Sequence, residues 1–212
     1  MEPLKLVAVS AGLSKPSSTR LLADRLAEAT ARELTAGESP VEVRVVELRD
    51  LAVDIANNLV TGFPSPALRE TREAVTGADG LIVVTPVFAA SYSGLFKSFF
   101  DLIEPDELNG MPVLLGATGG TSRHSLVLEH ALRPLFSYLH TLILPTAVFA
   151  ATDDWGTGAD TYAGGLSARI DRAGREFARL LAGRNPTATP GGRKSAEMDE
   201  VVPFEQLLAD LA

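Results

Sequence analysis

Apolar runs and amphipathic segments alternate along the chain. The apolar runs are rich in β-branched residues and lie too far apart to form hairpins, so each is typical of a strand buried on both faces. Between them, apolar residues recur every three or four positions, which is the period of an α-helix. This alternation predicts βαβ crossovers and a parallel sheet covered on both faces. The expected strands are 4–9, 41–48, 81–84, 112–117 and 142–149, and the expected helices are 18–36, 67–75, 94–103, 122–139 and 166–181.

Five strands in a chain of 212 residues favour one doubly wound α/β domain. Among the doubly wound layouts we expect a three-layer sandwich with a five-stranded parallel sheet of order 2-1-3-4-5. The order is an analogy with the flavodoxin-like class, because no residue count determines it.

Two parts of the chain lack this periodicity. Residues 52–66 have no clean period and contain several asparagines and prolines, which predicts an irregular crossover. Residues 184–202 are rich in proline and glycine and are typical of a linker. Residues 203–208 could form a short amphipathic helix that packs on its own domain or docks on a partner subunit. We therefore expect one domain over residues 1–183 and a linker with a short terminal segment over residues 184–212.

Composition narrows the functional classes. A net charge of −8 disfavours binding to nucleic acid or to an anionic membrane surface. No apolar run approaches the roughly 20 residues that span a bilayer, and the N-terminus lacks a signal-peptide pattern, so a cytoplasmic protein is expected. The chain has no cysteine and its three histidines have no recognised metal spacing with carboxylates, so no metal site is predicted.

The loops after strands one, three and four should lie together, because the carboxyl ends of parallel strands share one edge of a sheet. The first loop, residues 10–20, carries five hydroxyls and leads into a helix, whose free N–H groups and dipole suit a phosphate dianion. The same serines could simply cap the helix. The loop has neither the Walker pattern nor Gly-x-Gly-x-x-Gly, so it suits a terminal monophosphate, as on a mononucleotide.

The other two loops suit a flat ligand. Residues 85–93 form an apolar segment around Pro86, with no acid, base or nucleophile. Residues 116–122 contain Gly119-Gly120, which lets the backbone approach a ligand or simply permits a tight turn. Together, the three loops predict a site for flavin mononucleotide (FMN), in which the cofactor rather than a side chain carries the chemistry.

These segments resemble the NAD(P)H-dependent FMN reductases, the flavodoxin-like group that supplies reduced flavin to two-component monooxygenases such as alkanesulfonate monooxygenase. The likeness runs from residue 4 to about residue 182. The first loop departs from the family, since Ser10-Ala11-Gly12-Leu13 stands where the family has Gly-Ser-x-Arg. The matching motifs are 78–88, 91–97 and 117–121, followed by His124, 131–135 and 148–150.

The resemblance implies which residues bind the cofactor. The first loop would hold the FMN phosphate, the proline loop would support the isoalloxazine ring and the Gly-Gly loop would line the ring's other edge. Arg20 and Lys15 could serve the FMN phosphate or the 2′-phosphate of NADPH, or be solvated surface charges. His124 could contact the flavin or face water. The expected cofactor-binding residues are Ser10, Ser17, Ser18, Thr19, Arg20, Pro86, Val87, Phe88, Thr118, Gly119, Gly120 and His124.

One proline interrupts the fourth helical pattern. Pro134 lies four residues after His130 and has no N–H to donate to the carbonyl of residue 130. A kink or a widened turn is therefore predicted between these residues. In the resembling reductases this helix packs against its twin in the oligomer, and a widened turn is associated with flavin that acts as a transferable substrate. A simple proline bend with a surface histidine is the alternative.

The resemblance implies an enzyme that transfers a hydride from NADPH or NADH to FMN and supplies reduced flavin to a flavin-dependent monooxygenase. It also implies a homodimer or homotetramer, and no side chain is expected to act as a catalytic nucleophile. Two alternatives use the same fold: a quinone, azo or metal-ion reductase with tightly bound FMN, and a noncatalytic binding module. An electron-carrier flavodoxin is disfavoured, because its Ser/Thr-x-Thr-Gly-x-Thr loop and its acidic flavin rim are absent.

Overall fold

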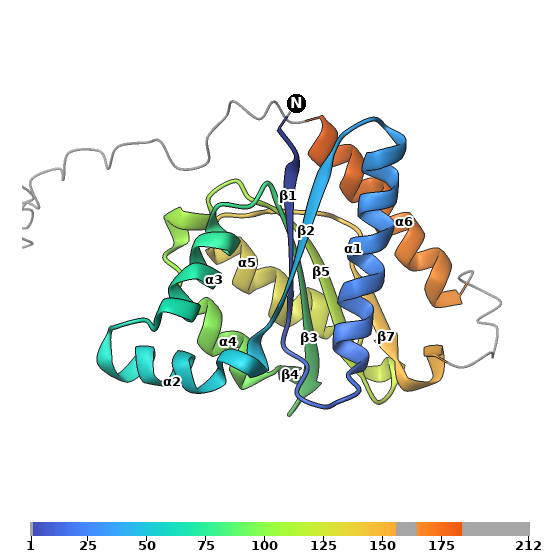
Figure 1. The fold of residues 1–212 in the computed structure, drawn as a ribbon. Helices are drawn as coiled ribbons and strands as arrows, with labels where there is room; N and C mark the ends of the chain where they lie inside the picture. The colour runs from blue at the N-terminus through green and yellow to red at the C-terminus, as the bar shows by residue number, and fades with distance from the viewer. Residues whose placement is uncertain (1, 156–164, 184–212) are drawn as a thin grey trace, which may run out of the picture.

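A parallel sheet lies between two layers of helices in the computed structural model, which describes residues 2–155 and 165–183 (Figure 1). The strand order is β2-β1-β3-β5-β6, and β7 also pairs with β5. The predicted order is confirmed, with the expected fifth strand divided into β6 and β7. The parallel strands are β1 (Leu4–Ser10), β2 (Val41–Glu47), β3 (Gly80–Phe88), β5 (Pro112–Gly119), β6 (Leu142–Ile143) and β7 (Val148–Ala151).

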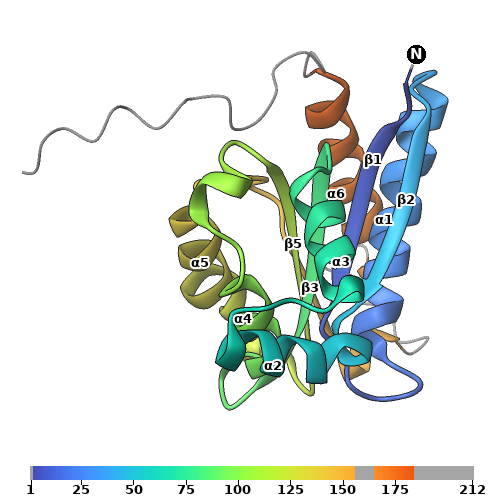
Figure 2. The same cartoon turned by 60° about the vertical axis from the view of Figure 1, so that its left-hand side comes forward.

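Helices cover both faces of the sheet (Figures 1 and 2). Successive strand side chains point to opposite faces, so Leu6 and Ala8 of β1 belong to one buried cluster, while Val7 and Val9 belong to the other. The first cluster packs under α1 (Ser18–Ala36) and α6 (Gly165–Ala182). The second packs under α2 (Ala52–Thr61), α3 (Pro66–Thr76), α4 (Gly94–Phe100) and α5 (Arg133–Tyr138).

The crossover after β2 is more regular than predicted. Residues 52–66 were expected to be irregular, which is wrong for residues 52–61: a short 3-10 helix, η1 (Leu48–Leu51), leads into α2, and only residues 62–65 lie outside a helix. Ile55 and Asn58 form the buried side of α2, whereas Val53 and Val60 are 73% and 87% exposed. Because apolar residues lie on both sides of this helix, the sequence shows no amphipathic period.

The segment after β3 is a hairpin rather than a loop. β3 continues through Pro86 to Phe88 and returns as the short antiparallel strand β4 (Ser91–Tyr92). The two turn residues, Ala89 and Ala90, have φ values of 46° and 66°. Two-residue hairpin turns of this kind usually carry asparagine and glycine, so an Ala-Ala turn gives no sequence signal.

Replacing either turn alanine by glycine is expected to stabilise the fold. A positive φ is unfavourable for alanine and free of cost for glycine, so Ala90→Gly should raise the free energy of unfolding by about 0.5 kcal/mol. Urea denaturation measures the change. Ala168→Gly, the same exchange at an exposed position of α6, is the control and should lower stability by about 1 kcal/mol. If both variants lost the same free energy of unfolding, the backbone at Ala90 would not be strained.

The fourth helical segment is divided into three pieces. Residues 122–139 were expected to form one long helix, but the chain forms a 3-10 turn, η3 (Ser122–His124), then a π-helix, η4 (Leu128–Leu132), and then α5. The amide of Arg133 donates to the carbonyl of Leu128, five residues earlier. The widened turn predicted between His130 and Pro134 is therefore confirmed.

Two arginines bind the outer edge of the sheet, where β6 gives way to β7. Arg133 donates from Nη1 to the carbonyl oxygen of Leu144 at 3.1 Å and from Nη2 to that of Pro145 at 2.5 Å. Arg169 of α6 donates from Nη1 to the carbonyl oxygen of Phe149 at 2.6 Å. The guanidinium groups thus bind two carbonyl oxygens in the break between the two strands and one in β7.

The predicted linker and terminal segment, residues 184–212, lie outside the described residues, so the domain boundary stays a prediction. Within the described part of the chain, no helix has both the length and the apolar character that a membrane span requires.

Candidate flavin-binding site

The three predicted loops leave the sheet from neighbouring positions. Ser10, the last residue of β1, pairs with Val84 of β3, which pairs with Gly116 of β5. Two residues further on, Pro86 pairs with Thr118. The hydroxyl-rich loop, the proline hairpin and the Gly-Gly loop therefore meet at the carboxyl edge of the sheet, as the sequence predicted.

A buried hydrogen bond joins the first and third loops directly. The Oγ1 atoms of Thr19 and Thr118 lie 2.8 Å apart, although the two residues are 99 positions apart in the sequence. Both side chains are buried. The resemblance assigns both residues to flavin binding, and the structure shows that their hydroxyls bind each other. They fix the start of α1 against the end of β5.

The first loop folds tightly over the start of α1. Ser17 caps this helix, since its Oγ accepts a hydrogen bond from the amide of Arg20 at 3.2 Å. A Cβ at Gly12 would lie 2.0 Å from Ser17 Oγ, so a larger residue there would displace the Ser17 hydroxyl. The buried Ser10 hydroxyl is 3.4 Å from the amide of Gly12. Ser18 is exposed, and the first turn of α1 has no acidic residue that would repel an anion.

The cations near this loop already have acidic partners or face solvent. Arg20 donates from Nε to Asp24 at 2.7 Å and from Nη1 to Glu47 at 2.8 Å. Its hydrogen bond to Asp24, together with the charges of Asp24 and Glu47, raises the pKa of Arg20 above its ordinary value against the opposing effect of burial. Lys15 is exposed. The alternative that Lys15 is a solvated surface charge fits this position.

Glu47 and Arg49 also lie at this edge of the sheet, but they were not among the site residues predicted from the sequence. Glu47 pairs with Ser10 in the register of β1 and β2, and its Oε2 lies 2.5 Å from Nη2 of Arg49. Arg49 also donates to the carbonyl oxygen of Ser14 in the first loop. The sequence did contain a signal for them, since two opposite charges stand at the carboxyl end of a predicted strand. That strand lies next to the strand that leads into the first loop.

The hairpin and the Gly-Gly loop form the other side of the rim. Phe88 is 45% exposed and offers an apolar surface, whereas Pro86 is buried in the pairing with β5. A Cβ at Gly119 would lie 2.9 Å from Cζ of Phe149, but a Cβ at Gly120 would meet no atom within 4 Å. Gly119 therefore permits a close approach inside the protein, and Gly120 faces open space.

Two further residues complete this side. His124 is exposed at the end of η3, and its Cβ lies 3.7 Å from where a Cβ of Gly119 would be. The Oγ1 of Thr121 is buried and has no hydrogen-bond partner, which a bound polar group could supply.

The residues present fit FMN. The start of a 19-residue helix offers unpaired N–H groups to a phosphate, and the exposed Phe88 offers an apolar surface to a ring. The unpartnered Thr121 hydroxyl and the open space at Gly120 lie on the third loop. Contact of each predicted residue with the cofactor stays a prediction.

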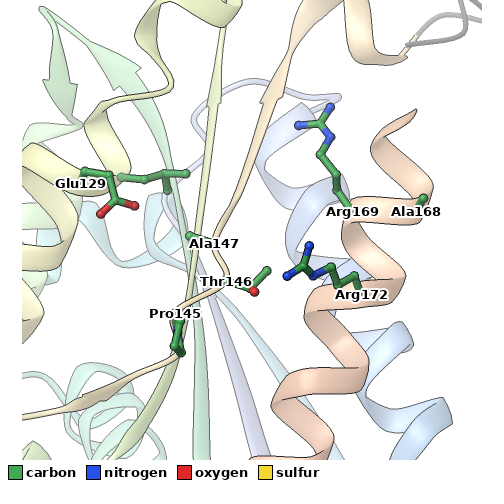
Figure 3. Close-up of a pocket in the computed structure, with 8 residues that line it drawn as sticks. Glu129, Pro145, Thr146, Ala147, Ala168, Arg169 and Arg172 are labelled. Atoms are coloured by element: carbon green, nitrogen blue, oxygen red, sulfur yellow. The ribbon is translucent and has the colours of Figure 1, made fainter. Parts of the chain in front are cut away.

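A separate cavity of about 500 Å³ lies beside the break between β6 and β7 (Figure 3). In Figure 3, Arg172 reaches from α6 toward Thr146. Arg172 and Thr146 both bind Glu176, and Glu129 binds Arg133. None of the predicted flavin-binding residues lines this cavity, so it is separate from the predicted flavin site. Its lining is Leu128, Glu129, Pro145, Thr146, Ala147, Ala168, Arg169 and Arg172.

The Thr146–Glu176 hydrogen bond makes a pH-dependent contribution to stability. The Thr146 hydroxyl, with Arg172 beside it, lowers the pKa of Glu176 below 4.5. The bond therefore stabilises the fold above the carboxyl's ordinary pKa and is lost as the pH falls through the lowered value. Thr146→Val should unfold at a lower urea concentration than wild type at neutral pH, and the difference should shrink as the pH falls through the lowered pKa of Glu176. Thr146→Ser keeps the hydroxyl and should match wild type; a loss independent of pH would contradict this origin.

Within residues 2–155 and 165–183, no cluster of three or more histidine or acidic side chains could hold a metal ion.

Comparison with known proteins identifies the family. Residues 4–156 match the model of the NADPH-dependent FMN reductases. The chain is 40% identical over 186 residues to an FMN reductase (NADPH) from Pseudomonas aeruginosa, covering 86% of this chain and 95% of the relative. It is 41% identical over 179 residues to the NADH-dependent FMN reductase SfnF from Pseudomonas fluorescens, covering 84% of this chain and 92% of the relative.

Solved structures agree with the fold. An X-ray structure of an oxidoreductase from Corynebacterium diphtheriae matches with a TM-score of 0.82 and 43% identity, covering 87% of this chain and 100% of that one. Two flavodoxins, at 15% and 14% identity, share the fold alone. The predicted flavodoxin-like class and the predicted NAD(P)H:FMN oxidoreductase activity are both confirmed. The chain belongs to the NADPH-dependent FMN reductase family.

Proposed function

We propose that this chain reduces FMN with NADPH or NADH and releases the reduced flavin to a flavin-dependent monooxygenase. The observation that carries this proposal is the shared rim, where the start of α1, the proline hairpin and the Gly-Gly loop converge. Relatives named for NADPH and for NADH match about equally well, so both nicotinamides are candidate donors.

The chain's residues bind and orient while the cofactor reacts. Bound FMN supplies the chemistry, because its ring accepts a hydride from the nicotinamide. The first-turn N–H groups of α1 and the exposed Ser18 would hold the phosphate. Phe88 and the hairpin would support the ring and exclude water from one side. The backbone around Gly119 and Gly120 would donate N–H bonds to the ring edge where negative charge develops.

Two observations favour a released flavin over a tightly retained one. Arg20 is already bound to Asp24 and Glu47, so it is less available to the phosphate. The π-helix η4 is the widened turn that the resemblance associates with transferable flavin. The alternative, a quinone, azo or metal-ion reductase, would hold FMN through purification.

The activity test uses desalted protein and follows the loss of nicotinamide absorbance with NADPH or NADH. We expect a colourless protein whose nicotinamide oxidation depends on added FMN. A protein that stays yellow and oxidises the nicotinamide without added FMN would favour the alternative reductases. Oxidation of neither nicotinamide in the presence of FMN would reject the reductase. Release to a monooxygenase is tested by coupling, since activity of a partner should rise with the concentration of this chain.

We also propose that the chain works as a homodimer or homotetramer. Val53 and Val60 lie seven residues apart on the outer side of α2, and Phe63, which follows the helix, is 81% exposed. Leu59 on the same helix is 48% exposed, so these side chains offer an apolar surface that a second copy could cover across a two-fold axis. Val60→Asp should then reduce the mass measured by analytical ultracentrifugation. A mass that falls only on removal of residues 184–212 would point to the terminal segment instead.

A further inference from the structure

A chain of ion pairs runs along the edge of the sheet beside the first loop. Glu47 lies between two arginines: its Oε1 accepts from Nη1 of Arg20 at 2.8 Å, and its Oε2 lies 2.5 Å from Nη2 of Arg49. The side chains of Glu47 and Arg49 are only 16% and 15% exposed. Largely buried charges of this kind persist when they are paired. The Nε of Arg49 is also buried and has no hydrogen-bond partner, so the close polar contacts of this side chain are those made by Nη1 and Nη2.

Arg49 reaches from this network into the first loop. Its Nη1 donates to the carbonyl oxygen of Ser14 at 2.6 Å, across 35 positions of sequence. Ser14 sits near the middle of the loop, between the close packing of Gly12 on Ser17 and the start of α1. The guanidinium thus fixes the loop where neither β1 nor α1 holds it.

We propose that Arg49 is a positioning residue for the FMN phosphate, which it serves by holding the first loop through the Ser14 carbonyl. This inference rests on the proposed function, because it assigns the phosphate to that loop. Arg49 acts through the loop rather than by direct contact, since its guanidinium is already engaged by Glu47 and Ser14. A loop held in its bound shape loses less conformational freedom on binding, and the affinity is higher for that reason.

The chemistry requires arginine at this position. Its planar fork presents separate N–H groups to the Glu47 carboxylate and the Ser14 carbonyl at once. A lysine ammonium keeps the charge but is a compact point donor on a flexible stem, so it would not hold both partners in the same geometry.

The test compares two flavins that differ only in the phosphate. Dissociation constants of FMN and riboflavin are measured by flavin fluorescence for wild type, Arg49→Lys and Arg49→Gln, alongside KM and kcat for FMN reduction. Both variants should weaken FMN binding and raise its KM about tenfold, a loss that corresponds to about 1.4 kcal/mol. The riboflavin dissociation constant and the kcat at saturating FMN should stay near wild type.

Arg44→Lys is the matched control. Arg44 lies on β2, the strand that leads into the 3-10 helix carrying Arg49, and it pairs with Glu70 on the exposed surface, away from the first loop. This variant should bind both flavins as wild type does. If Arg49→Gln does not fold, Arg49→Lys still tests the proposal through the same two constants.

Three results would overturn the inference. Equal weakening of FMN and riboflavin would show a general structural role, and unchanged FMN binding in Arg49→Lys would show that the fork is not needed. In both cases wild type still reduces FMN, so the proposed function survives. Wild type that neither binds nor reduces FMN would instead reject the proposed function, and the inference with it.

Discussion

Gly12→Ala is expected to raise the dissociation constant of FMN at least about tenfold, which is a loss of about 1.4 kcal/mol. A methyl group at this position would lie 2.0 Å from Ser17 Oγ and 3.1 Å from Cβ of Thr19. Ser17 would have to leave its capping position, where it binds the amide of Arg20, and loss of an N-cap alone costs about 1 kcal/mol. The loop would open where the phosphate is expected to bind, and titration with FMN measures the effect.

Gly37→Ala provides the comparison at the other end of the same helix. Its added Cβ would lie 3.5 Å from the carbonyl oxygen of Leu34, an ordinary contact, and its φ of −89° suits alanine. This variant should bind FMN as wild type does. If Gly12→Ala also kept full FMN affinity, the phosphate would not depend on the shape of the first loop.

Gly174→Ala is expected to lower the free energy of unfolding by about 2 kcal/mol, despite the better helix propensity of alanine. Gly174 lies where α6 crosses α1. A Cβ there would be 2.7 Å from Cβ of Ala29, 2.9 Å from its carbonyl carbon and 3.0 Å from the amide nitrogen of Thr30. Backbone atoms cannot rotate away, so the two helices would have to separate.

Urea denaturation of the double variant Ala29→Gly/Gly174→Ala sharpens this test. Removing the Ala29 methyl relieves only one of the three close contacts, so the double variant should recover part of the lost stability once the intrinsic cost of glycine in α1 is allowed for. Strictly additive losses would indicate that the two helices do not meet as closely as described.

Most of the fold could be predicted from the sequence, because each buried parallel strand appears there as a continuous apolar run. Pro134 predicted the widened turn, because proline has no N–H to complete the regular helical hydrogen bond, and this signal is local in the sequence. The signals failed where burial was incomplete. In α2 the exposed Val53 and Val60 hid the buried side formed by Ile55 and Asn58, and Ala89-Ala90 gave no sign of a turn with positive φ.

The position of the candidate site could be predicted from the sequence, but the role of each side chain in it could not. Hydroxyls suggested a cradle, but those of Thr19 and Thr118 bind each other, and Ser17 caps α1. Such roles depend on which groups meet in space, and no spacing within one loop reveals them. The same holds for Glu47 and Arg49, whose importance arises only from the neighbouring strand and loop.

The bonds from the two helix arginines, Arg133 and Arg169, to the carbonyl oxygens near β6 and β7 have a consequence for association. An open strand with free carbonyls is a template on which another polypeptide can add by backbone pairing, and charged side chains at such positions prevent it. With Leu144, Pro145 and Phe149 already bound by Arg133 and Arg169, growth of the sheet into a neighbour would first require breaking those bonds. These bonds therefore disfavour the pairing of another main chain at Leu144, Pro145 and Phe149, and a neighbour that binds at these residues would contact side chains.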